Sequence, residues 1–330
     1  MGKPEISVIF PVFNERENLE TLVSRVDPVL SGVSNGSFEV VFVDDGSRDG
    51  SAEMLDAVSA GDRRYKVLHF SRNFGHQAAL QAGLDAATGN CVVLMDADLQ
   101  DPPELVGALI EKWREGYEVV YAVRKRRKES LWKRMAYSAF YRTMRWIAEI
   151  DAPLDAGDFC LMDRRVVDTL VALRERNRFL RGLRSWVGFR QIGVEYDRDA
   201  RHAGEPKYTF RKLVGLAVSG YVGFSSMPLR LAAWLGATTA TVGFVLGLWA
   251  ILSKFLNPNV PPGWASTAAV IFFIGGLQLT MLGVIGEYLG RVYEEVRMRP
   301  LYIVSNRVGF SETESRASLD RSESTRTVSR

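Results

Sequence analysis

The order of apolar and polar positions predicts a sheet of short buried strands in the first 125 residues. The runs ISVIFPVF, EVVFVDDG, KVLHFS, CVVLMDAD and EVVYAV are apolar over most of their length, as is typical of parallel strands buried on both faces. The segments 15–31, 51–62, 75–88 and 103–115 lie between them and are predicted to be helices. This alternation of strand and helix predicts a doubly wound α/β domain.

Two long uncharged stretches follow in the last third of the chain. Residues 231–253 and 265–286 are 23 and 22 residues long and contain no charged side chain. Each exceeds the roughly 20 residues that a helix needs to cross a hydrocarbon core. The connection between them carries one Lys and no Arg, whereas basic residues flank the pair on its outer sides. By the positive-inside rule, we expect the first domain and both chain termini to face the cytoplasm.

Polar residues gather where the first four predicted strands end. Each set alone could be turn chemistry, because Asp, Asn, Gly and Ser are ordinary turn formers. Four sets at one edge predict a shared ligand site, since doubly wound sheets bind ligands beyond the carboxyl ends of their strands. The sets contain Pro11, Phe13 and Glu15, then Asp44, then Gly75 and Gln77, and finally Asp96, Ala97 and Asp98.

The stretch DADLQDPPE combines two different signals. Asp101, two prolines and Glu104 have the pattern of a helix start with an N-cap acid and a capping-box glutamate. Asp96 and Asp98 are left unexplained by it. The chain has no G-x-G-x-x-G after a strand and no G-x-x-x-x-G-K-[ST], so a diphosphate would lack its usual cradle. Two carboxylates at a strand end suit Mg²⁺ or Mn²⁺, which would bridge them to a nucleotide diphosphate.

Composition adds little to this picture. Lys and Arg number 42 against 39 Asp and Glu, for a net charge of +3. The two cysteines, Cys91 and Cys160, predict neither a disulfide framework nor a metal cluster, and we interpret them as buried thiols. The Ser/Thr/Arg/Glu-rich tail 311–330 has almost nothing to bury and is predicted to be disordered.

The motifs PVFNERENL, VDDGSRDGS, DADLQDPPE, GDF and RHAGEPKY together resemble family-2 glycosyltransferases of the GT-A fold. More narrowly, they are similar to polyprenyl-phosphate glycosyltransferases, the relatives of dolichol-phosphate mannose synthase. The ending LGVIGEYLGRVYEEVRMRPLYIV resembles the two-span bactoprenol glucosyltransferase branch, and the resemblance covers about residues 5 to 305. It implies an α/β, Rossmann-like GT-A nucleotide-sugar domain followed by interfacial helices and two transmembrane helices. The expected divisions are 1–209 (cytoplasmic domain), 210–230 (interfacial helices), 231–253 and 265–286 (transmembrane helices) around an external loop 254–264, 287–310 (cytoplasmic segment) and the tail 311–330.

The resemblance also implies an activity. We expect an inverting, Mg²⁺- or Mn²⁺-dependent transfer of a hexose, glucose from UDP-glucose, to undecaprenyl phosphate on the cytoplasmic leaflet of the plasma membrane. Enzymes that use UDP-N-acetylglucosamine, GDP-mannose or UDP-aminoarabinose share these motifs, so the sequence leaves the donor open. The branch suggests a homo-oligomer, a tetramer, formed through the membrane and interfacial helices, and no nucleic-acid partner.

Nucleotide-binding roles are carried over from the family position by position. Pro11, Phe13 and Glu15 would border the base and ribose, and Phe42 and Asp44 would lie on the base, with Asp44 bonding a pyrimidine ring. Asp96 would reach the ribose or the sugar. The metal ligands would be Asp96, Asp98 and Gln100, and further donor contacts would come from Gly75, Gln77 and Ala97.

Phosphate contacts and the catalytic aspartate are assigned in the same way. Arg201 and Lys207 lie in RHAGEPKY, where the family has a loop that closes over the diphosphate and reaches the lipid phosphate. Arg124, the residue of the basic run 124–128 nearest the strand end, would also contact a phosphate, and the others would lie at the membrane surface. Asp158 in GDF matches a family aspartate proposed as base. A phosphomonoester is already largely a dianion at neutral pH, so base and positioning roles both stay open for Asp158.

Two other classes of protein remain as alternatives. A processive polysaccharide synthase would need a Q-x-x-R-W motif, but residues 142–146 read RTMRW and only two spans are predicted. A membrane scaffold that binds a nucleotide sugar without turnover would not need the complete set of Asp158, Arg201 and Lys207. Metal-dependent release of a nucleoside diphosphate discriminates between the scaffold and an enzyme.

Overall fold

The computed structural model describes residues 3–34, 37–124, 156–173, 175, 178–196, 227–256 and 263–311. The chain divides into two compact units: the described residues up to 196 together with 300–311 form one, and residues 227–299 form the other. Arg201, Lys207, the basic positions 125–128, most of the expected interfacial segment and the tail from residue 312 lie outside the described residues.

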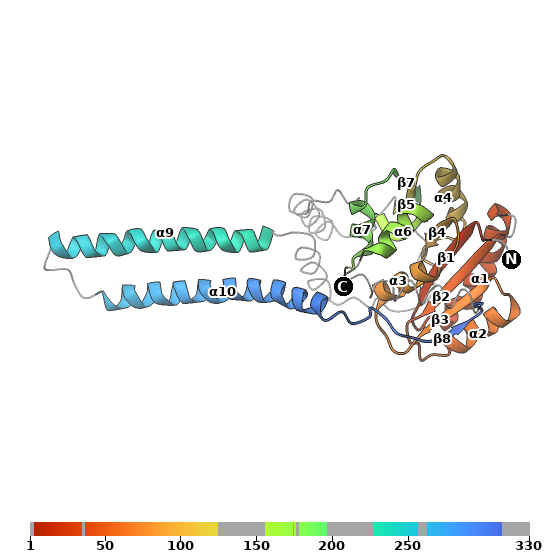
Figure 1. Ribbon diagram of the computed structural model, residues 1–330, viewed down its shortest axis with the longest axis horizontal. Helices are drawn as coiled ribbons and strands as arrows, with labels where there is room; N and C mark the ends of the chain where they lie inside the picture. The colour runs from red at the N-terminus through yellow and green to blue at the C-terminus, as the bar shows by residue number, and fades with distance from the viewer. Residues whose placement is uncertain are drawn as a thin grey trace, which may run out of the picture. The chain divides into compact units, whose positions relative to one another are not determined.

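The first unit is built on a mixed sheet of eight strands, in the order β7-β5-β6-β4-β1-β2-β3-β8 (Figure 1). The predicted apolar runs form β1 (Ile6–Val12), β2 (Phe38–Asp44), β3 (Tyr65–Phe70), β4 (Cys91–Leu94) and β5 (Val119–Arg124). The prediction missed β6 (Ala156–Asp163), β7 (Gln191–Tyr196) and β8 (Val304–Val308). β1 to β4 are parallel as expected, but β6 runs antiparallel to β4 and β5, and β8 antiparallel to β3. The five predicted strands thus run in the same direction, and the two antiparallel strands are among the three that the prediction missed.

Helices cover both faces of this sheet. The four predicted helices form as α1 (Arg16–Ser34), α2 (Ser51–Gly61), α3 (His76–Ala86) and α4 (Leu105–Arg114), and they are joined by α6 (Arg164–Ala172) and α7 (Leu180–Trp186). α1, α2 and α4 pack over one face, and α3, α6 and α7 over the other. Alternate side chains along each strand face opposite layers. In β1, Val8 and Phe10 point toward α1 and α4, whereas Ile9 points toward α3.

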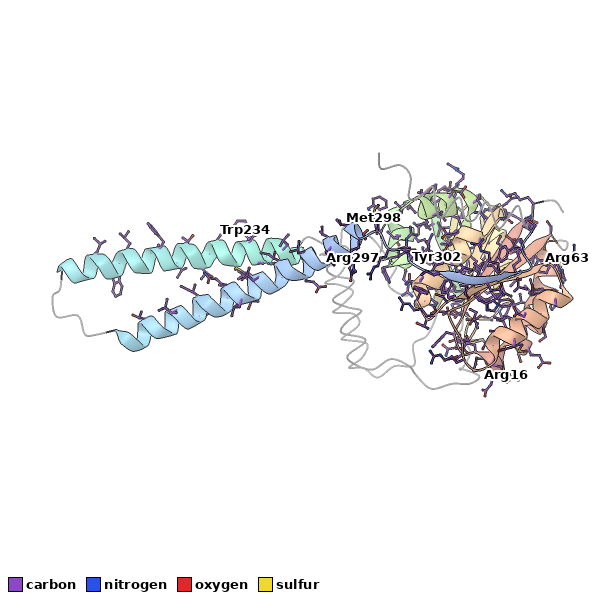
Figure 2. All side chains as sticks on the ribbon, turned by 60° about the horizontal axis from the view of Figure 1, so that its bottom comes forward. Arg16, Arg63, Trp234, Arg297, Met298 and Tyr302 are labelled. Atoms are coloured by element: carbon purple, nitrogen blue, oxygen red, sulfur yellow. The ribbon has the colours of Figure 1, made fainter. Side chains whose placement is uncertain are left out.

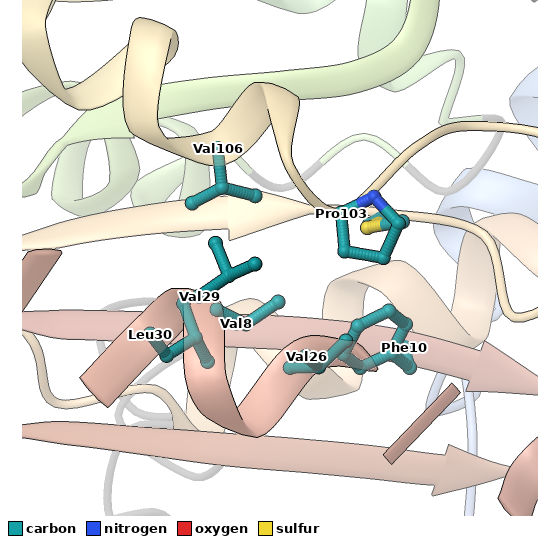
Figure 3. Close-up of a pocket in the computed structure, with 8 residues that line it drawn as sticks. Val8, Phe10, Val26, Val29, Leu30, Pro103 and Val106 are labelled. Carbon is teal, nitrogen blue, oxygen red and sulfur yellow. The ribbon is translucent and has the colours of Figure 1, made fainter. Parts of the chain in front are cut away.

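The layer between α1 and α4 is wholly apolar around β1. Figure 3 shows side chains from α1, β1 and α4 closing around a narrow crevice. With no polar group in its lining, the crevice belongs to the core and offers no means of recognising a sugar or a phosphate. Its lining is Val8, Phe10, Val26, Val29, Leu30, Met95, Pro103 and Val106.

The regular part of α4 begins a few residues after the predicted start at Asp101. α4 begins at Leu105, and its N-cap, Glu104, makes no side-chain capping hydrogen bond. The buried carboxylate of Asp101 accepts a hydrogen bond from the hydroxyl of Tyr196 at the end of β7, and Glu104 pairs with Arg25 of α1 at 2.8 Å. Both acidic groups thus have tertiary partners.

The chain returns to the sheet after the second unit. β8 lies on the free side of β3, with Val67 opposite Val308. Just before it, the Tyr302 ring stacks on Phe70 with centroids 5.1 Å apart, and the Tyr302 hydroxyl donates to the Asp85 carboxylate of α3 at 2.7 Å. Residues on both sides of the second unit in the sequence therefore build one sheet.

The second unit consists of two long helices that lie side by side (Figure 1). α9 (Met227–Leu256) and α10 (Trp264–Val296) contain the predicted spans 231–253 and 265–286 and extend beyond them. Gly236 of α9 packs against the thioether of Met281 of α10. Large apolar side chains such as Trp234, 73% exposed, point outward from the pair (Figure 2). Among the described residues, Phe273–Val296 is long and apolar enough to cross a membrane, and Leu231–Val245 is a shorter apolar stretch.

Candidate active site

The loops that follow β1 and β2 are joined by backbone-to-side-chain hydrogen bonds. The Asn14 amide oxygen accepts from the Arg48 N–H at 2.8 Å, and the Ser47 hydroxyl oxygen accepts from the Asn14 N–H at 3.0 Å. Pro11 ends partly buried, while Phe13 keeps 37% of its surface exposed at this edge. Glu15 accepts from the side-chain amide of Asn18 at 2.7 Å and also keeps an exposed part. The loops are thus held in place, and the Phe13 side chain stays partly exposed.

Phe42 does not lie at the site. It is 1% exposed and stacks between Phe10, at 5.5 Å between centroids, and Tyr65, at 6.2 Å. A ring enclosed between two other rings has no face left for a nucleobase, so the expectation that Phe42 contacts the base is corrected. The alternation of β2 explains its place, because Phe42 shares the inner face with Phe38 and Val40.

Asp44, at the end of β2, is held on both carboxylate oxygens. Oδ1 accepts the N–H of Ser47 at 2.9 Å, and Oδ2 lies 3.0 Å from Nδ1 of His69, its neighbour in the β2–β3 register. Burial opposes ionisation, but the hydrogen bonds from His69 and Ser47 outweigh it and lower the pKa of Asp44. Asp44 is therefore a fixed, ionised hydrogen-bond acceptor.

Asp45 organises the loop that leads into α3. It accepts the backbone N–H groups of Phe74, at 2.6 Å, and Gly75, at 2.9 Å. Gly75 has φ +99°, in the left-handed region that favours glycine, so this turn depends on it. Gln77 accepts the N–H of Leu180 at 3.0 Å and ties the start of α3 to α7. Gly75 and Gln77 thus fix the backbone at the start of α3 and its contact with α7.

Asp96 and Asp158 come together through the pairing of β4 with β6. Leu94 lies opposite Cys160 in this antiparallel register, and continuing it by two residues sets Asp96 opposite Asp158. His76, the first residue of α3, lies between them, with Nε2 at 3.7 Å from Asp96 and 3.6 Å from Asp158. Burial alone would lower the pKa of His76, but Asp158 and Asp96 raise it, so the imidazole favours its charged form.

α7 adds two arginines beside Asp158. Arg181 Nη2 lies 3.2 Å from Asp158, and Arg184 is 2% exposed with both Nη atoms 3.5 Å from the carbonyl of Gly157. Despite burial, His76 and Arg181 hold the pKa of Asp158 well below its usual range. Within the part of the chain that the structure describes, the Nε atoms of both arginines are buried without a hydrogen-bond partner. The cluster thus has spare donors for an anion.

The residues around Asp96 fit a divalent cation by their chemistry. Burial and the nearby carboxylates of Asp158, Asp101 and Asp98 raise the pKa of Asp96 to about 6, although His76 opposes the rise. A bound cation reduces the repulsion between neighbouring carboxylates, and carboxylate oxygens are the ligands that Mg²⁺ and Mn²⁺ prefer. Among the described residues no three His, Cys, Asp or Glu side chains are grouped as a metal cluster. Any such ion would therefore need ligands from the substrate as well.

The other expected site residues are placed as follows. Asp98 accepts the Gln100 N–H at 3.2 Å, both residues are partly exposed, and the Ala97 side chain is buried. Arg124 is the last residue of β5, paired with Tyr196 of β7. Arg201 and Lys207 lie outside the described residues, so their roles stay predictions.

His69, His76 and Arg181 are site residues that the sequence analysis did not assign. His76 was within reach, because it follows the third strand beside Gly75 and Gln77. Arg181 gave no signal, since it lies 105 positions from His76 in the chain. His69 lies inside the apolar run of β3, and the sequence analysis treated this run as a buried strand without a functional side chain.

Two family models match this chain. The model of glycosyl transferase family 2 matches residues 7–171, and that of the GtrB C-terminal hairpin matches residues 227–292. The chain belongs to glycosyltransferase family 2. It is 46% identical to the uncharacterized glycosyltransferase YkcC of Bacillus subtilis, over 93% of this chain and 95% of that one. It is 40% identical to the bactoprenol glucosyl transferase of Shigella phage SfV, over 92% of this chain and 98% of that one.

A solved structure of glucosyl-3-phosphoglycerate synthase from Mycobacterium tuberculosis, in complex with Mn²⁺ and UDP, matches with a TM-score of 0.43 and 20% identity. The match covers 67% of this chain and 78% of that one. The structure has the expected α/β sheet, the family-2 match supports its GT-A-like character, and the expected C-terminal hairpin matches a family model of its own. The hairpin and the apolar segment of α10 indicate association with a membrane. The expected division of the chain and the expected oligomer stay predictions.

Proposed function

We propose that this glycosyltransferase transfers glucose from UDP-glucose to undecaprenyl phosphate at the cytoplasmic leaflet of the plasma membrane. The observation that carries the proposal is the cluster of Asp96, His76, Asp158 and Arg181 in a chain that also has an apolar hairpin. The identity of 40% to a bactoprenol glucosyl transferase over nearly the whole of both chains supports the same donor and acceptor.

The donor would lie along the carboxyl ends of β1, β2 and β4. Asp44 accepts the N3–H of uracil, and the exposed ring of Phe13 packs on the base, with Pro11 and Glu15 beside the ribose. Asp96, Asp98 and Gln100 would hold Mg²⁺ or Mn²⁺, together with the diphosphate oxygens. The ion, when bound, neutralises charge on the departing UDP. Arg201 and Lys207 are proposed to cover the same diphosphate.

In the reaction, an oxygen of the lipid phosphate attacks the anomeric carbon and the bond from that carbon to the UDP oxygen breaks, with inversion. The lipid phosphate is largely a dianion at neutral pH and has no proton to lose before it attacks. Asp158 is ion-paired with Arg181 and His76, and a carboxylate held in this way is a poor proton acceptor. We therefore assign Asp158 to positioning Arg181 and His76, with the buried donors of α7 facing the phosphate.

The acceptor would reach this site from the membrane. α9 and α10 are the proposed anchor, and a hairpin with basic outer flanks places both of its ends on the cytoplasmic side. Arg124, at the end of β5, is the proposed contact to the lipid phosphate.

The test is UDP release by the detergent-purified full chain with Mn²⁺ or Mg²⁺, with and without undecaprenyl phosphate. Lipid-dependent release from UDP-glucose, and not from UDP-galactose, UDP-N-acetylglucosamine or GDP-mannose, is the expected result. Turnover with another donor alone would keep the reaction and replace the sugar. Release that does not depend on lipid would overturn the proposed acceptor.

Matched variants separate chemistry from folding. Asp96→Asn should lower the rate by at least about 100-fold, the usual scale for loss of an electrostatic group at a reaction centre. Asp168→Asn is the control, because Asp168 is an exposed acid on α6 whose ion-pair partner among the described residues is Arg164, at 3.5 Å. It should retain the activity of the parent chain.

A further inference from the structure

His69 lies in β3 between two carboxylates that come from different elements. Its Nδ1 is 3.0 Å from Asp44 Oδ2 at the end of β2, and its Nε2 is 3.0 Å from Asp56 Oδ1 on α2. The imidazole is buried, with its side chain 10% exposed, whereas the Asp56 side chain is 47% exposed. The His69 carbonyl also accepts the hydroxyl of Ser305 from β8 at 3.1 Å. The ring is thus fixed from β2, α2 and β8.

This arrangement sets the charge of the ring. A neutral imidazole has one N–H and can donate to only one of the two carboxylates, whereas an imidazolium donates to both. The hydrogen bond to Asp44 and the one to Asp56 raise the pKa of His69 in spite of burial. With Ser47 on its other oxygen, Asp44 has little freedom to rotate or to take up a proton.

We propose that His69 is a positioning residue for nucleobase recognition, which holds Asp44 ionised and oriented to accept the N3–H of uracil. The inference rests on the proposed UDP donor. A carboxylate can only accept hydrogen bonds, and uracil carries a hydrogen on N3 where cytosine has a lone pair. A fixed, ionised Asp44 therefore selects uracil over cytosine, and His69 supplies the charge and the geometry for that selection.

The same pair of strands carries an internal comparison. At the opposite end of β2 and β3, Glu39 and Lys66 form a second ion pair, 2.8 Å apart and with side chains 3% and 9% exposed. Both pairs join β2 to β3 and both are buried, but only Asp44 and His69 lie at the carboxyl ends, where the loops of the site begin. Lys66 is therefore the matched control for a purely structural ion pair.

Three variants of the full chain separate positioning from stability. His69→Asn keeps an amide N–H near the place of Nδ1 and so keeps a donor to Asp44, whereas His69→Gln places its amide near Nε2 and keeps only the donor to Asp56. Lys66→Gln removes the control pair. Each is measured by thermal unfolding, by titration calorimetry with UDP and CDP in the presence of Mn²⁺, and by the KM and kcat for the donor.

We expect His69→Gln to weaken UDP binding about 10-fold, the scale of one lost hydrogen bond to a charged group, with CDP binding unchanged. The KM for the donor should rise by the same factor while kcat stays within about 2-fold, since the base is remote from the reacting bond. His69→Asn should restore most of the UDP affinity, and Lys66→Gln should lower the unfolding temperature and leave UDP binding as in the parent chain.

Failure of the His69 inference and failure of the proposed UDP donor give different results in these measurements. If His69→Gln binds UDP as tightly as the parent and only loses thermal stability, as Lys66→Gln does, His69 is a core ion-pair residue and the inference is overturned. If the parent chain itself binds no uridine nucleotide, the proposed donor fails, and the role of His69 fails with it.

Discussion

Replacing Asp158 by Asn tests whether this carboxylate is a base or a positioning group. The replacement leaves the shape of the side chain and removes the charge that faces Arg181 at 3.2 Å and His76 at 3.6 Å. With side chains 19% and 28% exposed, the pair of Asp158 and Arg181 lies between an exposed ion pair and a buried one. A coupling of about 2 kcal/mol follows, which corresponds to a factor of about 30 in rate.

The assay is a double-mutant cycle on kcat/KM for lipid-dependent UDP release, with Asp158→Asn, Arg181→Gln and both together. We expect the double variant to be about 30-fold more active than the product of the two single losses predicts, because each single change already breaks the pair. Asp158→Asn should keep any acid limb of the parent's pH profile, because the pKa of Asp158 lies well below the assay range. Additive losses, or the disappearance of an acid limb in Asp158→Asn, would refute the positioning role and favour a base.

Three further predictions follow from the described contacts. Gly83→Ala should destabilise the protein by about 1–3 kcal/mol in thermal unfolding, because its Cβ would lie 2.3 Å from Ile9 Cγ2, whereas Gly61→Ala, with open space around it, should be near neutral. Chelation by EDTA should abolish UDP release and added Mn²⁺ should restore it in the parent, but Asp96→Asn should stay inactive at the same Mn²⁺ concentration. The pKa of His69 is raised in the folded protein, so the stabilisation that its charge provides is complete below the ordinary pKa of about 6.5. This stabilisation is lost as the pH rises through the raised pKa of the folded state. The difference in unfolding temperature between the parent and His69→Gln should therefore become smaller in alkaline buffer. A gap that widens would contradict the ion-paired imidazolium.

The strands that the sequence predicted correctly are those with strong local signals. β1 to β4 are buried on both faces, so their apolar runs stand out from the helices around them. β7 reads QIGVEY and β8 reads VSNRV, which are half-exposed edge strands with mixed composition. The strands that pair with β7 and β8 lie far away in the sequence. The local pattern of apolar and polar residues carries no information on pairing between segments so far apart in the chain. The antiparallel β6 was missed for the same reason.

The site divides in a similar way. Asp44 and Asp96 follow apolar runs and were found by their position alone, whereas Arg181 reaches Asp158 only because β6 and α7 fold against each other. Phe42 was misassigned because a phenylalanine in a strand looks the same whether its ring faces a ligand or the core. The hydrogen bond that Asp101 accepts from the hydroxyl of Tyr196, 95 positions away, could not be predicted from the local pattern.

The return of the chain to the sheet at β8 has a topological consequence. β8 is hydrogen-bonded to β3, so these two strands, one before α9 and one after α10 in the chain, must lie on the same side of any membrane that the two helices enter. The chain between β3 and β8 therefore crosses such a membrane an even number of times. The one long apolar segment found in α10 could not by itself have established this. It also sets the order of synthesis: the edge of β3 stays uncovered until α10 has been made, so the catalytic sheet is completed last. A fragment that stops before α9 would keep the carboxylates of the site but would lack β8 and the contact of Tyr302 with Asp85. Its open strand edge would be a site for self-association.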